Sequence, residues 1–119
     1  MGKGDPNEAL AHFLGAVRDH RSEEIRDLLL PSVTLKVKAL RRGRVSTIIF
    51  LQGVEAVGEF LQKTFPELGD YELRLAESDG LHAAVEWRGA TDSARWTNLT
   101  MLIEFSGKAV VNISIMGNT

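Results

Sequence analysis

The apolar residues near the start of the chain repeat with a helical period. Leu10, Phe13, Leu14 and Val17 are spaced so that they share one face of a helix. An Asp-Pro pair at 5–6 fits the capping and first helical positions of this element. The pattern therefore predicts an amphipathic helix that begins at this pair and buries one face.

Two further stretches have the same period. A short helix is predicted to begin at Ser22, which can cap it, and Pro31 is expected to end it. A third helix is predicted after Gly53, and Pro66 closes it. Its apolar face is formed by Val57, Phe60, Leu61 and Phe65.

Elsewhere the pattern changes to a period of two, which is typical of strands. Turn-forming residues, including a Ser-Asp-Gly at 78–80 and a Ser-Gly-Lys at 106–108, separate the alternating stretches. Six strands are predicted, over residues 33–40, 45–51, 71–77, 81–88, 95–105 and 109–116. Consecutive strands joined by short turns are expected to pair in antiparallel fashion.

The predicted element order is ααββαββββ, which indicates an α+β fold. A length of 119 residues, 44% of them hydrophobic, is consistent with a single domain over residues 1–119. The absence of cysteine excludes disulfides, thiolate metal sites and cysteine nucleophiles. We find no secretory signal and no apolar run near the ~20 residues that span a bilayer, so we expect a cytoplasmic protein without a membrane partner.

Several landmarks link this order to a known family. They are the first helix with Phe13 and Val17, the Ile-Arg-Asp-Leu at 25–28, the Gln-Gly-Val-Glu-Ala-Val at 52–57 and the Phe-Ser-Gly-Lys at 105–108. With the element order, they resemble the nuclear-transport-factor-2-like (cone fold) superfamily. That group includes ketosteroid isomerases, SnoaL-like polyketide cyclases, enzymes like limonene-epoxide hydrolase, and non-catalytic dimer modules.

The resemblance implies a cystatin-like curved antiparallel sheet wrapped around three helices, with a pocket at the open end of the cone. Residues of one strand parity would line the pocket with the first helix. Counting back from the turn at Gly107 gives the parity of the last two strands, although a bulge would invert a strand. The expected ligand-binding residues are Phe13, Val17, Val37, Val85, Trp87, Thr97, Leu99, Met101, Asn112, Ser114 and Met116.

The family chemistry is not evident in these residues. The places that hold a tyrosine and two aspartates in ketosteroid-isomerase-like members hold Phe13, Val37 and Met101 here, and none of these exchanges a proton. His12 is the remaining catalytic candidate, with a solvated histidine as the alternative. No pair of histidines has metal-ligand spacing on one element, so we expect neither a metal nor a cofactor.

The other face of the predicted sheet suggests a partner. Trp96, Leu102, Ile113 and Ile115 are expected to face away from the helices. An apolar patch of this size favours burial against a second copy. The sequence therefore predicts a homodimer through this face.

A basic hairpin is the last distinctive feature. Its cations are Lys36, Lys38, Arg41, Arg42 and Arg44. They favour either contact with an anion or acidic partner, or a solvated strand edge in which lysine discourages aggregation. The net charge of −2 and the lack of an aromatic residue between Lys36 and Arg44 argue against nucleic acid.

Two functions remain open. The leading hypothesis is a domain that binds a small, mostly apolar ligand, with lyase-, isomerase- or hydrolase-type activity left undecided. The alternative is a non-enzymatic homodimeric interaction module, or an engineered scaffold, of the same fold.

Overall fold

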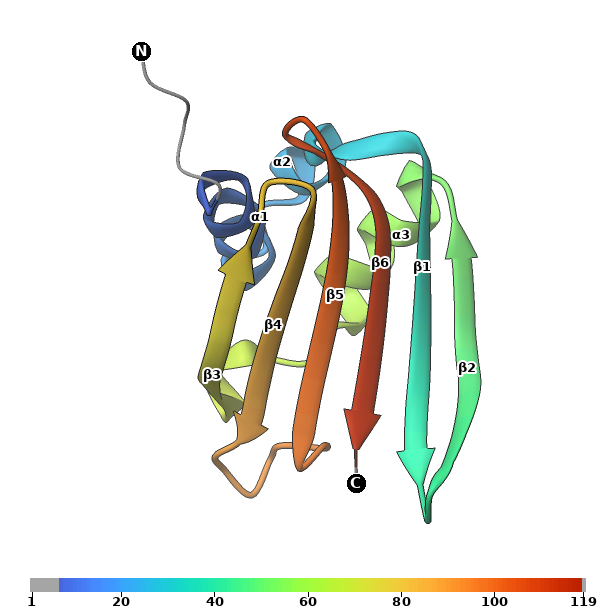
Figure 1. The fold of residues 1–119 in the computed structure, drawn as a ribbon, viewed down its shortest axis with the longest axis vertical. Helices are drawn as coiled ribbons and strands as arrows, with labels where there is room; N and C mark the ends of the chain where they lie inside the picture. Colours follow the sequence, from blue (N-terminus) through green and yellow to red (C-terminus); the bar gives the residue numbers. More distant parts are fainter. Residues whose placement is uncertain (1–6, 119) are drawn as a thin grey trace.

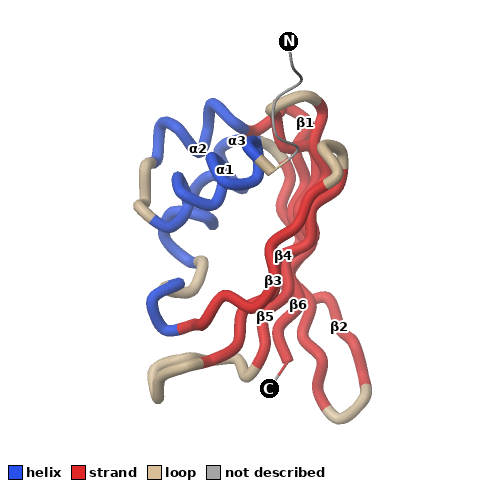
Figure 2. The backbone as a smooth tube through the Cα atoms, turned by 60° about the vertical axis from the view of Figure 1, so that its left-hand side comes forward, coloured by secondary structure: helices blue, strands red, loops and turns tan. Residues whose placement is uncertain are grey.

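Three helices lie on one face of a six-stranded sheet. The computed structural model describes residues 7–118. The helices cover one end of the sheet, and the strands extend beyond them at the other end (Figure 2). The helical elements are α1 (Glu8–Arg18), α2 (Ser22–Leu28) and α3 (Val54–Glu59), followed by a π-helical turn (Phe60–Thr64) and a 3₁₀ turn (Leu68–Asp70).

The sheet has the strand order β2-β1-β6-β5-β4-β3 (Figure 1). Its strands are β1 (Leu29–Arg41), β2 (Arg44–Gln52), β3 (Tyr71–Ser78), β4 (His82–Gly89), β5 (Asn98–Ser106) and β6 (Ala109–Asn118). Consecutive strands joined by short turns pair in antiparallel fashion as predicted, but β1 and β6 pair in parallel. The predicted curved sheet around three helices is confirmed, and the sheet is mixed rather than wholly antiparallel.

Three element boundaries differ from the prediction or lie beyond it. The Asp-Pro pair at 5–6 lies outside the described residues. Pro31 does not end α2 but lies within β1, in a stretch where the pairing with β6 is interrupted between Leu29 and Thr34. A proline there removes no ladder hydrogen bond. Residues 95–97 form a loop, so β5 begins only at Asn98.

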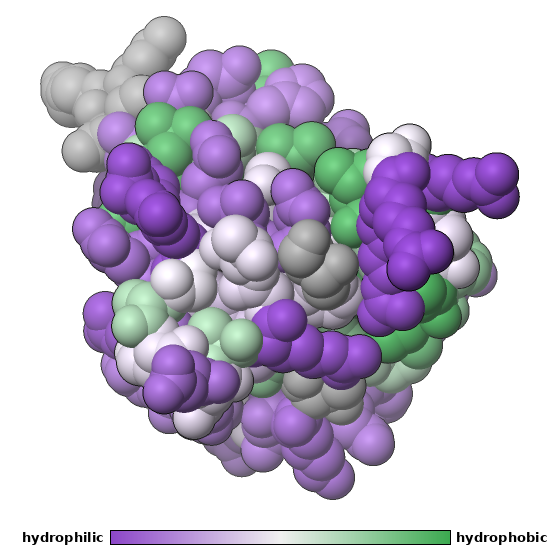
Figure 3. All heavy atoms as spheres, turned by 90° about the horizontal axis from the view of Figure 1, so that it is seen from below, coloured by the Kyte–Doolittle hydropathy of each residue, from purple (hydrophilic) through white to green (hydrophobic). Residues whose placement is uncertain are grey.

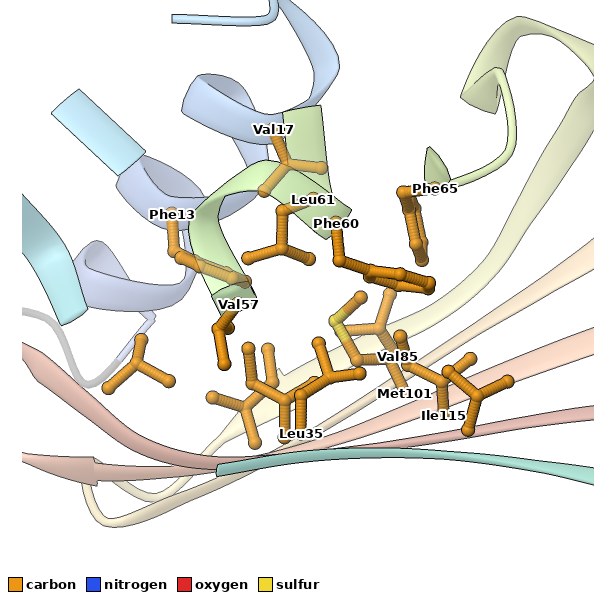
Figure 4. Packing of buried hydrophobic residues seen from close by; sticks show 14 of the residues in the cluster. Phe13, Val17, Leu35, Val57, Phe60, Leu61, Phe65, Val85, Met101 and Ile115 are labelled. Atoms are coloured by element: carbon orange, nitrogen blue, oxygen red, sulfur yellow. The ribbon is translucent and has the colours of Figure 1, made fainter. Parts of the chain in front are cut away.

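The core lies between the helices and the sheet. Phe13 and Val17 of α1 lie beside Val57 and Leu61 in the layer between the helices and the sheet (Figure 4). The ring of Phe65 packs edge-on against Phe60 and Trp87, with centroid distances of 6.5 and 6.2 Å. Among the residues whose burial is described, no polar or charged one is buried, so the core consists of hydrophobic side chains.

A β-bulge determines which side chains of β6 face this core. Phe105 pairs with Val110, whereas Glu104 pairs with Asn112, so Val111 is an extra residue. Such a bulge inverts the alternation beyond it. Ile113 and Ile115 therefore face the helices and are buried. The expectation that Asn112, Ser114 and Met116 face the cone was wrong, because it assumed an unbroken ladder from the Gly107 turn.

Candidate functional site

Seven of the expected pocket residues lie where the sequence placed them, on the helix-facing side. All seven are buried in the single hydrophobic cluster, so they fill the interior of the cone. These residues are Phe13, Val17, Val37, Val85, Trp87, Leu99 and Met101. Contact between them and a ligand stays a prediction.

The other four expected pocket residues lie elsewhere. Thr97 is exposed in the loop before β5. Asn112, Ser114 and Met116 are half-buried on the outer face of the sheet. The hydroxyl of Thr34 on β1 donates a 2.8 Å hydrogen bond to Oδ1 of Asn112, so this amide is engaged with its neighbouring strand.

Among the residues whose burial is described, no histidine or acidic side chain is buried. The three positions that correspond to the isomerase residues hold the buried apolar side chains of Phe13, Val37 and Met101. His12 lies on the exposed side of α1, where its Nε2 contacts a carboxylate oxygen of Glu24. Within the described part of the chain, histidines and acidic residues do not form a cluster that could hold a metal ion.

The mouth of the cone is closed by Trp96. The expected dimer face included this residue with Ile113 and Ile115, but all three are buried on the helix-facing side, and only Leu102 is exposed. That expectation was wrong for two reasons. The bulge turns β6 over, and the loop before β5 folds Trp96 inward. The space that remains beside Trp96, Phe65 and Ile115 is a cavity of about 60 Å³, too small for an organic ligand.

A larger cleft lies on the flank of the helix layer. It has a volume of about 520 Å³, which is within the range of small-molecule sites. It is bounded by α1, the 3₁₀ turn, β3 and β4. Its lining consists of Leu10, Ala11, Leu14, Gly15, Leu68, Gly69, Tyr71, Leu73, Ala76 and Trp87, with Asn7 and Arg18 as the polar members.

The sequence of α1 explains why there is room for this cleft. One face of the helix, with Phe13 and Val17, enters the core. An adjacent face carries the small residues Ala11 and Gly15 beside Leu14, and the small side chains keep the helix surface back from β3. Our sequence analysis missed this face. The signal was Leu14, whose position beside two small residues extends the apolar surface of the helix past its core stripe.

On the strand side, Leu73 gives the cleft its exposed apolar wall. It pairs with Trp87, so both side chains lie on the helix-facing side of the sheet. Trp87 is buried, whereas 55% of the Leu73 side chain surface is exposed. A large aliphatic side chain that lines a concave surface and stays exposed is a typical feature of a site that an apolar ligand covers.

The electrostatics of the cleft are simple. Its lining includes one charged residue, Arg18, whose Nε donates a 3.1 Å hydrogen bond to Oδ1 of Asp19. This bond raises the pKa of Arg18 and is the main cause that lowers the pKa of Asp19. The lining residues include no histidine or carboxylate. The hydroxyl of Tyr71, a further polar member of the lining, accepts a hydrogen bond from the backbone N–H of Trp96.

A second, more polar groove lies on the outer face of the sheet. It has a volume of about 640 Å³ and runs along the ends of β3, β4 and β5 near the 78–81 turn. Oδ1 of Asp79 accepts hydrogen bonds from the backbone N–H groups of Leu81 (2.8 Å) and His82 (2.7 Å). Both bonds lower the pKa of Asp79, and the bond from His82 has the larger effect. The other polar residues of the groove are Glu77, Ser78, Glu104, Asn112 and Ser114.

Comparison with known proteins identifies the fold. No family model and no curated protein matches the sequence. An NTF2-like protein of unknown function from Mesorhizobium loti superposes with a TM-score of 0.73 at 11% identity, covering 99% of this chain and 98% of its own. A proposed ketosteroid isomerase from Kribbella flavida gives 0.66 at 18% identity, covering 94% and 76%. A de novo designed protein with a curved β-sheet also gives 0.66, at 21% identity, covering 98% and 88%.

The chain therefore has the nuclear-transport-factor-2-like cone fold. At these identities the similarity shows the fold alone, and one fold carries many functions. None of the helices within residues 7–118 combines the length and apolar character needed to cross a membrane.

Proposed function

We propose that this protein binds a small, mostly apolar molecule in the cleft between α1 and β3, beside the filled cone instead of within it. The observation that carries the proposal is the cleft of about 520 Å³ whose lining is mostly apolar and includes the exposed Leu73. Covering this side chain with a ligand removes apolar surface from water, at about 25 cal/mol per Å². The lining contains no histidine or carboxylate, so what we propose is binding without catalysis.

A neutral fluorescent probe tests this proposal. N-phenyl-1-naphthylamine fluoresces strongly only in an apolar site, and Trp87 in the cleft wall is placed to transfer excitation energy to it. We expect saturable binding to the wild-type protein and loss of binding in Leu73→Glu, which places a charge on the apolar wall.

Leu81→Glu is the matched control, because Leu81 is an equally exposed leucine in the β3–β4 turn, outside the cleft. Ala11→Phe adds a second test, since a ring at this position would fill the cleft from the helix side. Equal loss in the Leu73 and Leu81 variants, or unchanged binding in the Leu73 and Ala11 variants, would refute the proposed site.

A second candidate function is a homodimeric module that pairs through the outer face of the sheet. The centre of the six-stranded order lies between β6 and β5. One row of outer side chains crosses this centre as Lys38, Met116, Thr100 and Glu86, because these residues pair successively. A two-fold axis parallel to the strands would place Lys38 of one copy opposite Glu86 of the other, allowing for the ~30° rotation between packed sheets.

The neighbouring row has the same symmetry. Here Ser114 would lie opposite the partner's copy of Leu102, and the small Ala84 opposite Lys36. The proposed face thus consists of Leu102 and Met116 flanked by complementary charges, in place of the four residues expected from the sequence.

Sedimentation equilibrium tests this face. We expect Glu86→Lys to dissociate the dimer and the double variant Lys38→Glu/Glu86→Lys to restore it. Glu59→Lys on α3 is the control and should have no effect. A monomeric wild-type protein at micromolar concentration would exclude this function.

A further inference from the structure

The β2 strand is an open edge of the sheet. Among the described strands it pairs only with β1, so one side of its backbone, over the nine residues Arg44–Gln52, has no neighbouring strand. An open edge of this length can accept another extended chain. Figure 2 shows that the free end of the β1–β2 hairpin lies beyond the helices, where no helix covers it.

The usual protection of an edge strand is weak here. After Arg44 the strand contains no charged residue and no proline. Val45, Ile48 and Phe50 expose 55%, 49% and 54% of their side chain surfaces. The one irregularity is a bulge, where Val37 pairs with Ile49 and Lys38 with Thr47, which leaves Ile48 as the extra residue. The strand thus offers an apolar, β-favouring edge in two regular stretches.

The same hairpin is strongly basic. It carries the five cations of the basic hairpin defined above, and no acidic residue occurs between Asp27 and Glu55. Within residues 7–118, none of these five cations forms an ion pair. Figure 3 looks at this end of the molecule and shows strongly hydrophilic side chains beside hydrophobic ones on its right-hand side. On a chain of net charge −2, this local charge favours an acidic partner.

We propose that an extended, acidic segment of another protein adds to β2 as a seventh strand. Backbone hydrogen bonds along the free edge supply affinity that does not depend on sequence. Acidic side chains of the segment pair with Arg42 and Arg44 at the hairpin tip. Apolar side chains of the segment cover Ile48 and Phe50 farther along the strand.

Other occupants fit the observations less well. A membrane surface would contact one face, but the exposed apolar residues lie on both: Phe50 pairs with the outward-facing Lys36, whereas Ile48 borders the cavity at the cone mouth. Nucleic acid would need bare aromatic rings, and the ring of Phe50 already has Nζ of Lys36 5.8 Å from its centroid. A second β2 strand offers no acidic side chain to the arginines.

The probe is a capped ten-residue peptide of alternating glutamate and valine with a fluorescent label, measured by anisotropy. We expect binding to the wild-type protein and a loss of about tenfold in affinity in the double variant Arg42→Glu/Arg44→Glu. Lys108→Glu is the control for a charge reversal away from the hairpin, to be compared with Arg42→Glu alone, because Lys108 lies in the β5–β6 turn at the opposite end of the sheet (Figure 1).

Two further peptides separate strand addition from simple charge attraction. A peptide with the same charges in which every residue is N-methylated has no backbone donor on either edge and should not bind. A lysine–valine peptide should not bind either. The proposal would be overturned if the first peptide does not bind or if the N-methylated peptide binds equally well. It would also be overturned if the protein binds phosphatidylserine vesicles or RNA more strongly than the peptide, or if it self-associates in a way that β2 substitutions abolish.

Discussion

The indole ring of Trp96 lies directly on the backbone of Gly117. A Cβ atom added to Gly117 would come within 2.3 Å of the ring, far inside contact distance. The backbone N–H of Trp96 donates a 3.2 Å hydrogen bond to the hydroxyl of Tyr71, and the guanidinium carbon of Arg95 lies 5.3 Å from the ring centroid. One side chain from a loop thus closes the end of the cone at which the family resemblance implied an open pocket.

This contact makes Gly117 intolerant of substitution. We expect Gly117→Ala to lower the free energy of unfolding by about 1–3 kcal/mol, because the new methyl group displaces a packed ring. Urea denaturation measures this change. Gly69→Ala is the control, since no atom lies within 4 Å of a Cβ at Gly69. If the clash is the cause, the double variant Trp96→Ala/Gly117→Ala should be less destabilised than the two single effects predict together.

Removing Trp96 should open the cone. We expect Trp96→Ala to lower the free energy of unfolding by about 3–5 kcal/mol, since a buried indole is lost and the cavity beside Phe65 and Ile115 grows. Added indole should bind in the vacated space and raise the melting temperature of the variant but not of the wild-type protein. A variant that indole does not stabilise would show that the loop collapses into the space instead.

Asp79 should make the β3–β4 turn sensitive to acid. Its pKa is lowered by the backbone N–H groups of His82 and Leu81, so it contributes stability above its unfolded pKa, about 3.9. This contribution is lost as pH falls through the lower, folded pKa. We expect the stability difference between wild type and Asp79→Asn, followed by urea midpoints, to shrink between about pH 5 and pH 2. A constant difference would contradict this assignment.

Gly58 is buried in α3, where an alanine would be favoured by helix propensity. A Cβ there would lie 3.2 Å from Cγ of Arg26, which can move because its side chain is partly exposed and pairs with Glu55 only at 3.4 Å. The propensity gain, up to about 1 kcal/mol, therefore exceeds the cost of this shift. We expect Gly58→Ala to raise the free energy of unfolding by about 0.5 kcal/mol in chemical denaturation. A loss of stability would mean that α2 and α3 cannot adjust.

The element order could be predicted from the sequence because two periods, 3.6 and 2, follow directly from the geometry of helices and strands. Val85 and Met101 were placed correctly for this reason. The residues of β6 that face the helices were predicted wrongly, because the bulge at Val111 adds one residue and no turn-forming residue in the sequence marks it. The alternation of Ile113 and Ile115 with polar neighbours was the better guide, since burial of apolar side chains determines register.

The candidate site was harder to predict than the fold. It depends on how far α1 stands from β3, and this distance results from small side chains at Ala11 and Gly15 and from the filled cone beneath them. Trp96 likewise faces inward because a loop folds back over Gly117, and no periodic pattern describes a loop. The homodimer and the cytoplasmic location remain predictions.

Our central proposal is that the ligand binds in the cleft between α1 and β3, on the flank of the cone, and not inside the cone. Methyl-resolved NMR during titration with N-phenyl-1-naphthylamine tests it most directly. We expect shift changes confined to the methyl groups that line the cleft, among them those of Leu14, Leu68 and Leu73. Changes centred instead on Val85 and Met101 in the cone would contradict it, as would a titration that moves no methyl resonance.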